Sequence, residues 1–185
     1  MLKTYKQMNS DNKGKSNEVY TRKIEADKLI KFLNKYNFKN KIIWCPFDTE
    51  KSNIVLSLKE NNYKVIYTHI STGQDFLNYN PDFNFDIMIS NPPFSKRTKF
   101  FNKINNYNKP YIMLQPIMFF NNNSMIKELI KNSNKYRFLM PNNRMGFIKN
   151  GVNYDKTTSF YSFWLCKDLF LDKNTFIELL EEWIW

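Results

Sequence analysis

The sequence predicts an α/β fold in which a mostly parallel sheet is flanked by helices. Three observations support this prediction: the alternation of strands and helices, the residues that end each strand, and a pair of consecutive strands near the C-terminus. Short apolar runs alternate with amphipathic helical segments along most of the chain, as in strand–helix–strand units. Each run ends at a proline or a polar residue, and two strand-like segments near the C-terminus follow each other with no helix between them. A length of 185 residues suits one domain, which we place at 18–185 after a flexible basic tail, 1–17.

The first half of the domain alternates regularly. Ile24, Leu29, Ile30 and Leu33 recur on one face of a helix predicted from Lys23 to Tyr36. The apolar run Lys41–Cys45 is then stopped by Pro46, which is typical of a buried strand. The remaining elements expected here are a helix at 52–60 and strands at 64–68, 85–90 and 110–114.

The second half is less regular. A helix at 124–131 precedes a short strand at 137–140. Segments 146–149 and 159–165 have the composition of two antiparallel arms around Asn150-Gly151, which would form an edge pair. An amphipathic helix is predicted over 174–185.

Composition narrows the classes of function. The formal net charge of +11 favours a polyanionic partner, although part of the lysine excess reflects the residue usage of an AT-rich genome. No apolar run is long enough to cross a membrane, and the start of the chain is polar. Cys45 and Cys166 lie in apolar segments, as buried reduced thiols of a cytoplasmic protein do. With His69 the only histidine, no metal site is expected.

Polar residues gather where the predicted strands end. Pro46-Phe47-Asp48 follows the first strand, His69 the second, and Asn91-Pro92-Pro93-Phe94 the third. Because open α/β sheets bind ligands beyond the carboxyl ends of their strands, these segments are the first candidates for a site.

The Asn91-Pro92-Pro93-Phe94 loop suits the methylation of an amino group on an aromatic ring. Two prolines fix the backbone and keep Asn91 out of helical conformation. The Asn91 side-chain oxygen and the Pro92 carbonyl can accept the two hydrogens of the amino group, which localises the nitrogen lone pair. Phe94 can stack on the ring, and such stacking contributes about 1–3 kcal/mol.

The segment Phe85–Phe94 resembles the catalytic motif of class I amino-methyltransferases that depend on S-adenosylmethionine (AdoMet). Over 20–167 the chain is similar to the small adenine-specific DNA methyltransferases of the EcoRI-methylase-like group, which are common in phages and bacteria. The resemblance implies a Rossmann-like methyltransferase fold, AdoMet as cofactor, and methylation of N6 of adenine in double-stranded DNA, with Asn91, Pro92, Pro93 and Phe94 as catalytic residues.

The same resemblance implies the remaining site residues. Those expected to bind the cofactor are Tyr20, Thr21, Pro46, Phe47, Asp48, His69, Asp75, Phe76 and Asn91. Arg144 lies in a segment similar to the late motif that holds the target base. Lys96 and Arg97 follow the catalytic loop, where they are placed to contact phosphate.

The chain departs from the family in its first cofactor loop. Segment 46–52 has no glycine where the common pattern has several, and His69 replaces the usual acidic partner of the ribose. Asp48 remains to bind the methionine ammonium, and Ser52 is placed to cap the next helix. Two other functions therefore stay open: an amino-methyltransferase acting on RNA or protein, and a nucleic-acid-binding protein with this fold and weak or lost AdoMet binding.

Overall fold

The computed structural model describes residues 19–36, 38–149, 152–154, 160–169 and 177–179. The predicted tail, 1–17, lies outside them. A seven-stranded sheet forms the centre, in the order β10-β6-β9-β5-β4-β2-β3. Only β9 runs antiparallel to its neighbours, β5 and β6. The strands are β2 (Ile42–Cys45), β3 (Lys64–Tyr67), β4 (Ile87–Ser90), β5 (Tyr111–Pro116), β6 (Tyr136–Met140), β9 (Ser162–Lys167) and β10 (Ile177–Leu179).

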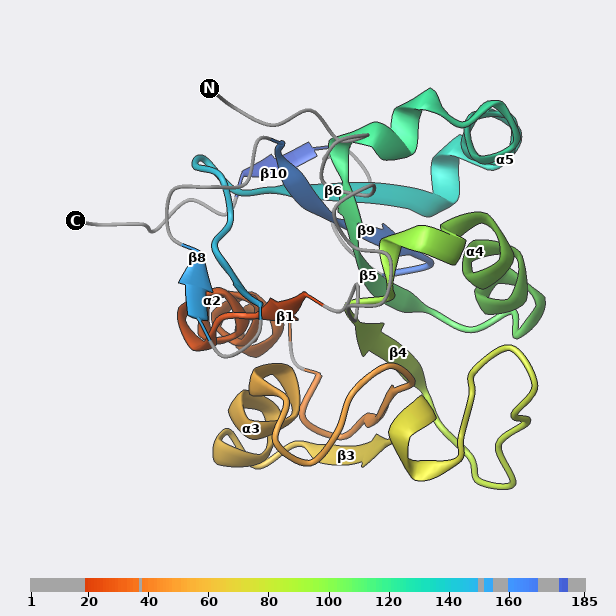
Figure 1. The fold of residues 1–185 in the computed structure, drawn as a ribbon. Coiled ribbons are helices and arrows are strands. Elements are labelled where there is room, and N and C mark those ends of the chain that lie inside the picture. Colours follow the sequence, from red (N-terminus) through yellow and green to blue (C-terminus); the bar gives the residue numbers. More distant parts are fainter. Residues whose placement is uncertain (1–18, 37, 150–151, 155–159, 170–176, 180–185) are drawn as a thin grey trace.

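Two pairs of helices cover the two faces of this sheet. Helices α2 and α3 pack on one face and α4 and α5 on the other (Figure 1). Their bounds are α2, Lys23–Lys35; α3, Asn53–Glu60; α4, Arg97–Asn106; and α5, Asn123–Lys131. Single 3-10 turns lie at 70–72, 94–96, 117–121 and 133–135. This arrangement confirms the predicted α/β class. None of the described helices is long and apolar enough to span a membrane.

Side chains alternate between the two faces along each strand, so each face has its own apolar core. Ile43 and Cys45 of β2 point toward α2 and α3, whereas Trp44 points toward α4. Trp44 is fully buried among four aromatic rings, those of Phe76, Phe83, Phe85 and Tyr107. Asp86, just before β4, accepts a hydrogen bond from the backbone N–H of Ile42 at 2.7 Å. This bond helps set the relative position of β2 and β4.

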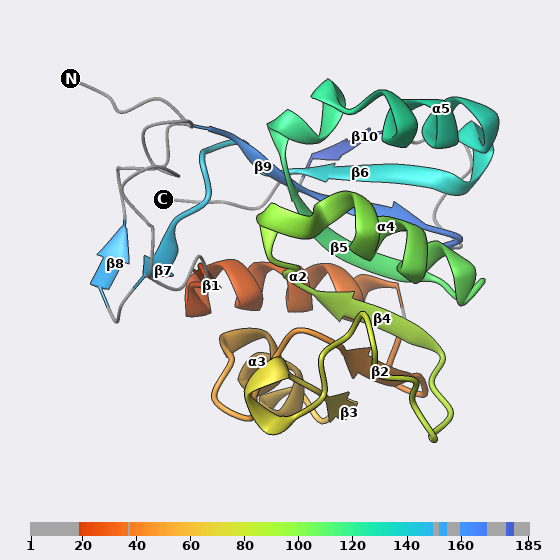
Figure 2. The same ribbon diagram turned by 45° about the vertical axis from the view of Figure 1, so that its right-hand side comes forward.

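A second, three-stranded sheet joins distant parts of the chain. Its strands are β1 (Tyr20–Thr21), β7 (Phe147–Lys149) and β8 (Val152–Tyr154), and β7 pairs antiparallel with both others. Figure 2 shows this sheet beside the N-terminal end of α2. It ties the segment before α2 to the segment after β6, and it places β1 next to the end of β4.

Three sequence expectations are corrected. Segment 147–149 does form an antiparallel pair across Asn150-Gly151 as predicted, but its second arm is β8, at 152–154, and not 159–165. Residues 162–167 instead form β9, between β5 and β6. Residues 177–179 form β10, parallel to β6, where a helix over 174–185 was predicted. Helix α4 was not predicted, although Phe100, Phe101 and Ile104 have helical spacing and are buried.

Gly146 provides a test of how the two sheets are joined. A methyl group added there would stand 2.5 Å from Nη1 and 2.7 Å from Cδ of Arg22, which precedes α2. Gly146→Ala must displace the Arg22 side chain, and we expect a loss of about 1–3 kcal/mol in unfolding free energy, as for other overpacking changes. Urea titration measures it.

The double variant isolates the cause. An Arg22→Ala background removes the three atoms nearest to the added methyl group, so Gly146→Ala should lower the unfolding free energy far less. An equal loss in both backgrounds would show that the Arg22 contact is not responsible.

Candidate active site

Two neighbouring cavities open at the carboxyl edge of β2, β3 and β4. The first, here called the Asn91 cavity, has a volume of about 520 Å³ counting the space at its mouth. Its lining residues are Val19, Tyr20, Thr21, Phe47, Asp48, Ser52, Asn53, Ile54, His69, Asn91, Pro92, Pro93 and Phe94. The second, here called the Phe76 cavity, measures about 820 Å³ on the same basis and shares Phe47, His69 and Pro93 with the first.

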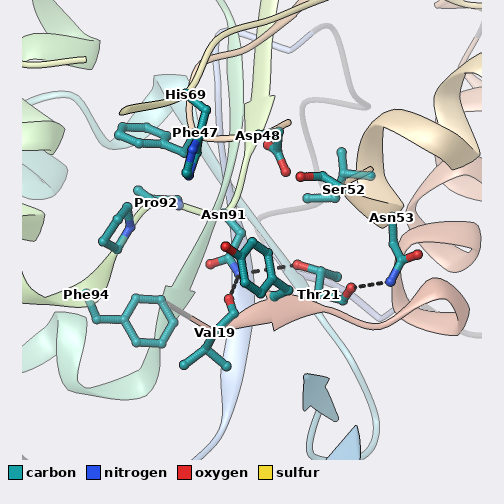
Figure 3. Close-up of a pocket in the computed structure, with 13 residues that line it drawn as sticks. Val19, Thr21, Phe47, Asp48, Ser52, Asn53, His69, Asn91, Pro92 and Phe94 are labelled. Atoms are coloured by element: carbon teal, nitrogen blue, oxygen red, sulfur yellow. Dashed lines mark hydrogen bonds between the residues drawn. The ribbon is translucent and has the colours of Figure 1, made fainter. Parts of the chain in front are cut away.

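The side-chain amide of Asn91 is held in one orientation. Its Nδ2 donates to the carbonyl of Val19 at 2.8 Å and to Oγ1 of Thr21 at 3.3 Å. Because a carbonyl oxygen can only accept, the amide nitrogen and not the oxygen must face Val19. Figure 3 shows the amide nitrogen bonded to β1, with the amide oxygen on the side away from Thr21. The oxygen that the sequence predicts as an acceptor therefore borders the cavity.

Asp48 is a buried acid at the back of the Asn91 cavity. Its carboxyl accepts a short hydrogen bond from Ser90, the last residue of β4, and a further one from Ser52. Burial raises its pKa to about 6, and the bonds from Ser90 and Ser52 oppose this rise. A ligand cation beside Asp48 would favour its charged form, which makes this carboxyl a suitable partner for an ammonium group.

Three successive backbone amides of the glycine-free loop are bonded within the protein. The N–H of Phe47 donates to Oγ of Ser90, that of Asp48 to the carbonyl of Thr68, and that of Thr49 to Oγ of Ser52. Ser52 stands at the N-cap of α3, but its side chain does not cap the helix as predicted, because it bonds to Thr49 and Asp48 instead. This loop presents side chains to the cavity where a glycine loop presents backbone.

His69 lies between the two cavities and is 7% exposed. The N–H of Ser71 donates to its Nδ1 at 3.1 Å, so Nδ1 carries no proton and the ring proton is on Nε2. The resemblance implies that His69 contacts the ribose of the cofactor. This tautomer makes Nε2 a hydrogen-bond donor, suited to the oxygen of a hydroxyl group.

The Phe76 cavity combines an aromatic wall with an acid. Phe76 is 2% exposed and packs on Phe47 and Phe100, which also line this cavity. Asp75 borders it as well, and its carboxylate accepts bonds from the N–H of Leu77 and from Nδ2 of Asn78. Gly73, in the left-handed region at φ +81°, ends the turn that leads to Asp75. Pro46 completes the predicted cofactor residues at this cavity.

Of the three predicted nucleic-acid-binding residues, only Lys96 lines either of the two cavities. Lys96 is exposed at the rim of the Phe76 cavity. Arg97 is half-buried at the start of α4, and its Nη1 is buried with no hydrogen-bond partner among the described residues. Arg144 lies over the ring of Tyr161, with its Cζ 5.4 Å from the ring centroid, and lines neither cavity.

Sequence reasoning missed several residues of the site. Ser90 donates a hydrogen bond to the carboxylate of Asp48, and Nδ2 of Asn53 donates one to the carbonyl of Thr21. A polar residue that ends an apolar strand was the available signal for Ser90. Phe160, whose ring lies edge-on to that of Phe94 with 6.1 Å between the ring centroids, belongs to no motif that the sequence shows. Val19 acts through its backbone carbonyl, which no sequence motif reveals.

Comparison with known proteins defines the fold class. No protein-family model and no curated protein matches the sequence. Among solved structures, a Listeria monocytogenes protein assigned as a class I AdoMet-dependent methyltransferase matches with a TM-score of 0.52 and 12% identity, over 96% of this chain and 71% of its own. The chain therefore has the Rossmann-like fold of the class I methyltransferases.

Two further structures match less closely. Precorrin 8W decarboxylase from Methanobacterium thermoautotrophicum aligns at a TM-score of 0.44 and 11% identity, over 79% of this chain and 90% of its own. TrmN from Thermus thermophilus aligns at 0.38 and 10% identity, over 80% of this chain and 49% of its own.

Proposed function

We propose that this protein is an AdoMet-dependent methyltransferase that modifies an exocyclic amino group, with N6 of adenine in DNA as its acceptor. The observation that carries the proposal is the Asn91 amide, fixed by β1 at the wall of a cavity with its oxygen left to accept. Pro92, Pro93 and Phe94 line the same cavity, so all four residues of the predicted catalytic loop come together there.

The residues that line the two cavities have the chemistry that the parts of the cofactor require. Asp48 would hold the ammonium of the methionine part, His69 would donate to a ribose hydroxyl, and Phe76 would lie against the adenine with Asp75 beside it. Tyr20, Phe47 and Pro46 would close the remaining walls. When bound, AdoMet supplies a methyl group on a positively charged sulfur.

The chain's own residues would prepare the acceptor nitrogen. Oδ1 of Asn91 and the carbonyl of Pro92 accept its two hydrogens, and the ring of Phe94 stacks on the base. Holding the nitrogen in this position supplies about 7–11 kcal/mol of the barrier when alignment is good. The excess proton leaves the nitrogen after methyl transfer, to solvent, so the site requires no strong base.

The net charge of +11 and the exposed Lys96 at the rim support a nucleic acid as acceptor. The test is transfer of labelled methyl from AdoMet to AT-rich duplex DNA, GC-only duplex DNA, RNA and a protein extract in parallel. The proposal expects label in the AT-rich duplex, recovered as N6-methyladenine. Label found in RNA or protein alone would show that DNA is not the acceptor, while methyl transfer to an amino group would still stand.

A second candidate rests on the loop 46–52. The backbone amides of Phe47, Asp48 and Thr49 are bonded within the protein, so a nucleic-acid-binding protein that has lost AdoMet is the alternative function. Calorimetry with AdoMet and with S-adenosylhomocysteine separates the two. Binding at micromolar concentration supports the enzyme, and no heat at millimolar concentration supports the binding protein.

A further inference from the structure

Thr21, one of the residues expected to bind the cofactor, lines the Asn91 cavity and also makes several hydrogen bonds within the protein. It is 4% exposed, and its Oγ1 lies 3.3 Å from Nδ2 of Asn91. The carbonyl of the same residue accepts a bond from Nδ2 of Asn53, the first residue of α3, at 2.9 Å. Its backbone is also paired with Phe147 of β7. Thr21 is thus fixed from three sides, and its hydroxyl is directed at the catalytic amide (Figure 3).

The Asn91 amide needs two acceptors to be fully held. An amide NH₂ group has two hydrogens, and a single bond to Val19 would leave the second one unpaired. With Thr21 as the second acceptor, both hydrogens are used within the protein, and a flip of the amide would place its oxygen against the carbonyl of Val19. The carbonyl of Val19 thus selects the orientation in which Oδ1 faces the cavity, and the Thr21 hydroxyl holds the second hydrogen of the amide in that orientation.

We infer that Thr21 is the positioning residue of Asn91, and that β1 serves to orient the catalytic amide before any ligand binds. This inference rests on the proposed function, because it concerns the orientation of the group that accepts from the substrate nitrogen. It assigns to Thr21 a role in the rate of transfer and not in the binding of the cofactor.

The test compares Thr21→Val, which keeps size and strand preference but removes the acceptor, with Thr21→Ser, which keeps the hydroxyl. Thr21→Val should lower kcat at saturating AdoMet by about 10- to 100-fold, the effect of a misplaced reacting group, and leave the Kd for AdoMet unchanged. Thr21→Ser should restore most of the rate.

Thr98→Val is the matched control. Oγ1 of Thr98 accepts a bond from Nδ2 of Asn122 at 2.9 Å, the same kind of contact, and Thr98 lines neither cavity. Its loss should leave kcat unchanged. The inference is overturned when Thr21→Val weakens AdoMet binding and keeps kcat, or when Thr21→Val and Thr21→Ser lower kcat equally.

A spectroscopic readout separates this inference from the proposed function. The side-chain NH₂ signals of Asn91 can be assigned by their absence in Asn91→Ala. In the protein without ligand, Thr21→Val should shift these signals and speed their exchange with solvent, and Thr98→Val should not. Unchanged signals would refute the positioning role whatever the protein methylates, whereas changed signals in a protein that transfers no methyl group would refute only the proposed function.

Discussion

Asn91→Ala should lower kcat for methyl transfer by about 100- to 1,000-fold, the range seen when one preorganised polar group is removed from a catalytic site. The change deletes the oxygen that accepts from the substrate nitrogen and leaves the carbonyl of Pro92 as the only other predicted acceptor. Because this contact strengthens as the nitrogen becomes tetrahedral, kcat and kcat/KM should fall together. Steady-state kinetics with labelled AdoMet measures both.

The Asn91→Asp variant separates the role of the side-chain oxygen from that of the amide NH₂ group. An aspartate keeps an oxygen at the same place but loses the donor to the carbonyl of Val19, so two oxygens then face each other. We expect a rate between those of the wild-type protein and Asn91→Ala. Asn102→Ala, at an exposed asparagine of α4, is the matched control and should retain full activity. Equal activity in Asn91→Ala and Asn102→Ala would contradict the proposed chemistry.

Much of the fold could be predicted because local signals agreed with the final packing. Apolar runs ended by proline gave β2, β4 and β5 within two residues, and the face that Leu29 and Leu33 share is the buried face of α2. The errors fall where pairing joins distant segments. Nothing local to Phe147 or Ser162 indicates that β7 pairs with β1 or that β9 inserts between β5 and β6.

The candidate site shows the same division. Asn91, Asp48 and His69 were found because each follows a predicted strand, and parallel strands bring their carboxyl ends to one edge. Their partners were not found. The bonds that Asn91 donates to Thr21 and Val19 cross 70 and 72 positions of sequence, so only the three-dimensional structure shows that Thr21 faces this amide. The role of Arg144 at the target base stays a prediction, and the structure adds only that this side chain lies over the ring of Tyr161.

Asp48→Asn should weaken AdoMet binding by at least about 30-fold, because breaking one partner of a buried charge pair removes about 2 kcal/mol or more. The dependence on pH gives this prediction its specificity. The pKa of Asp48 is raised to about 6 by burial, so its carboxyl is largely neutral at pH 5 and charged at pH 7. Affinity for AdoMet should therefore rise between about pH 5 and pH 7 in the wild-type protein and stay level in Asp48→Asn. Calorimetry across this range measures it.

The stability of the ligand-free protein should change in the opposite direction. A carboxyl whose pKa is higher in the folded than in the unfolded state stabilises the fold at low pH, and this contribution is lost as pH rises from about 4 through 6. Asp48→Asn should accordingly gain stability relative to the wild-type protein over that interval, while Asp82→Asn, at an exposed carboxyl, should not. Near pH 7 the charged Asp48 would bind a ligand cation best, yet there it destabilises the ligand-free protein. An asparagine at this position would give the more stable fold, so this pattern would indicate that Asp48 is retained for binding. If Asp48→Asn instead lost stability at pH 7 and bound AdoMet as the wild-type protein does, Asp48 would be structural and the cofactor assignment would fail.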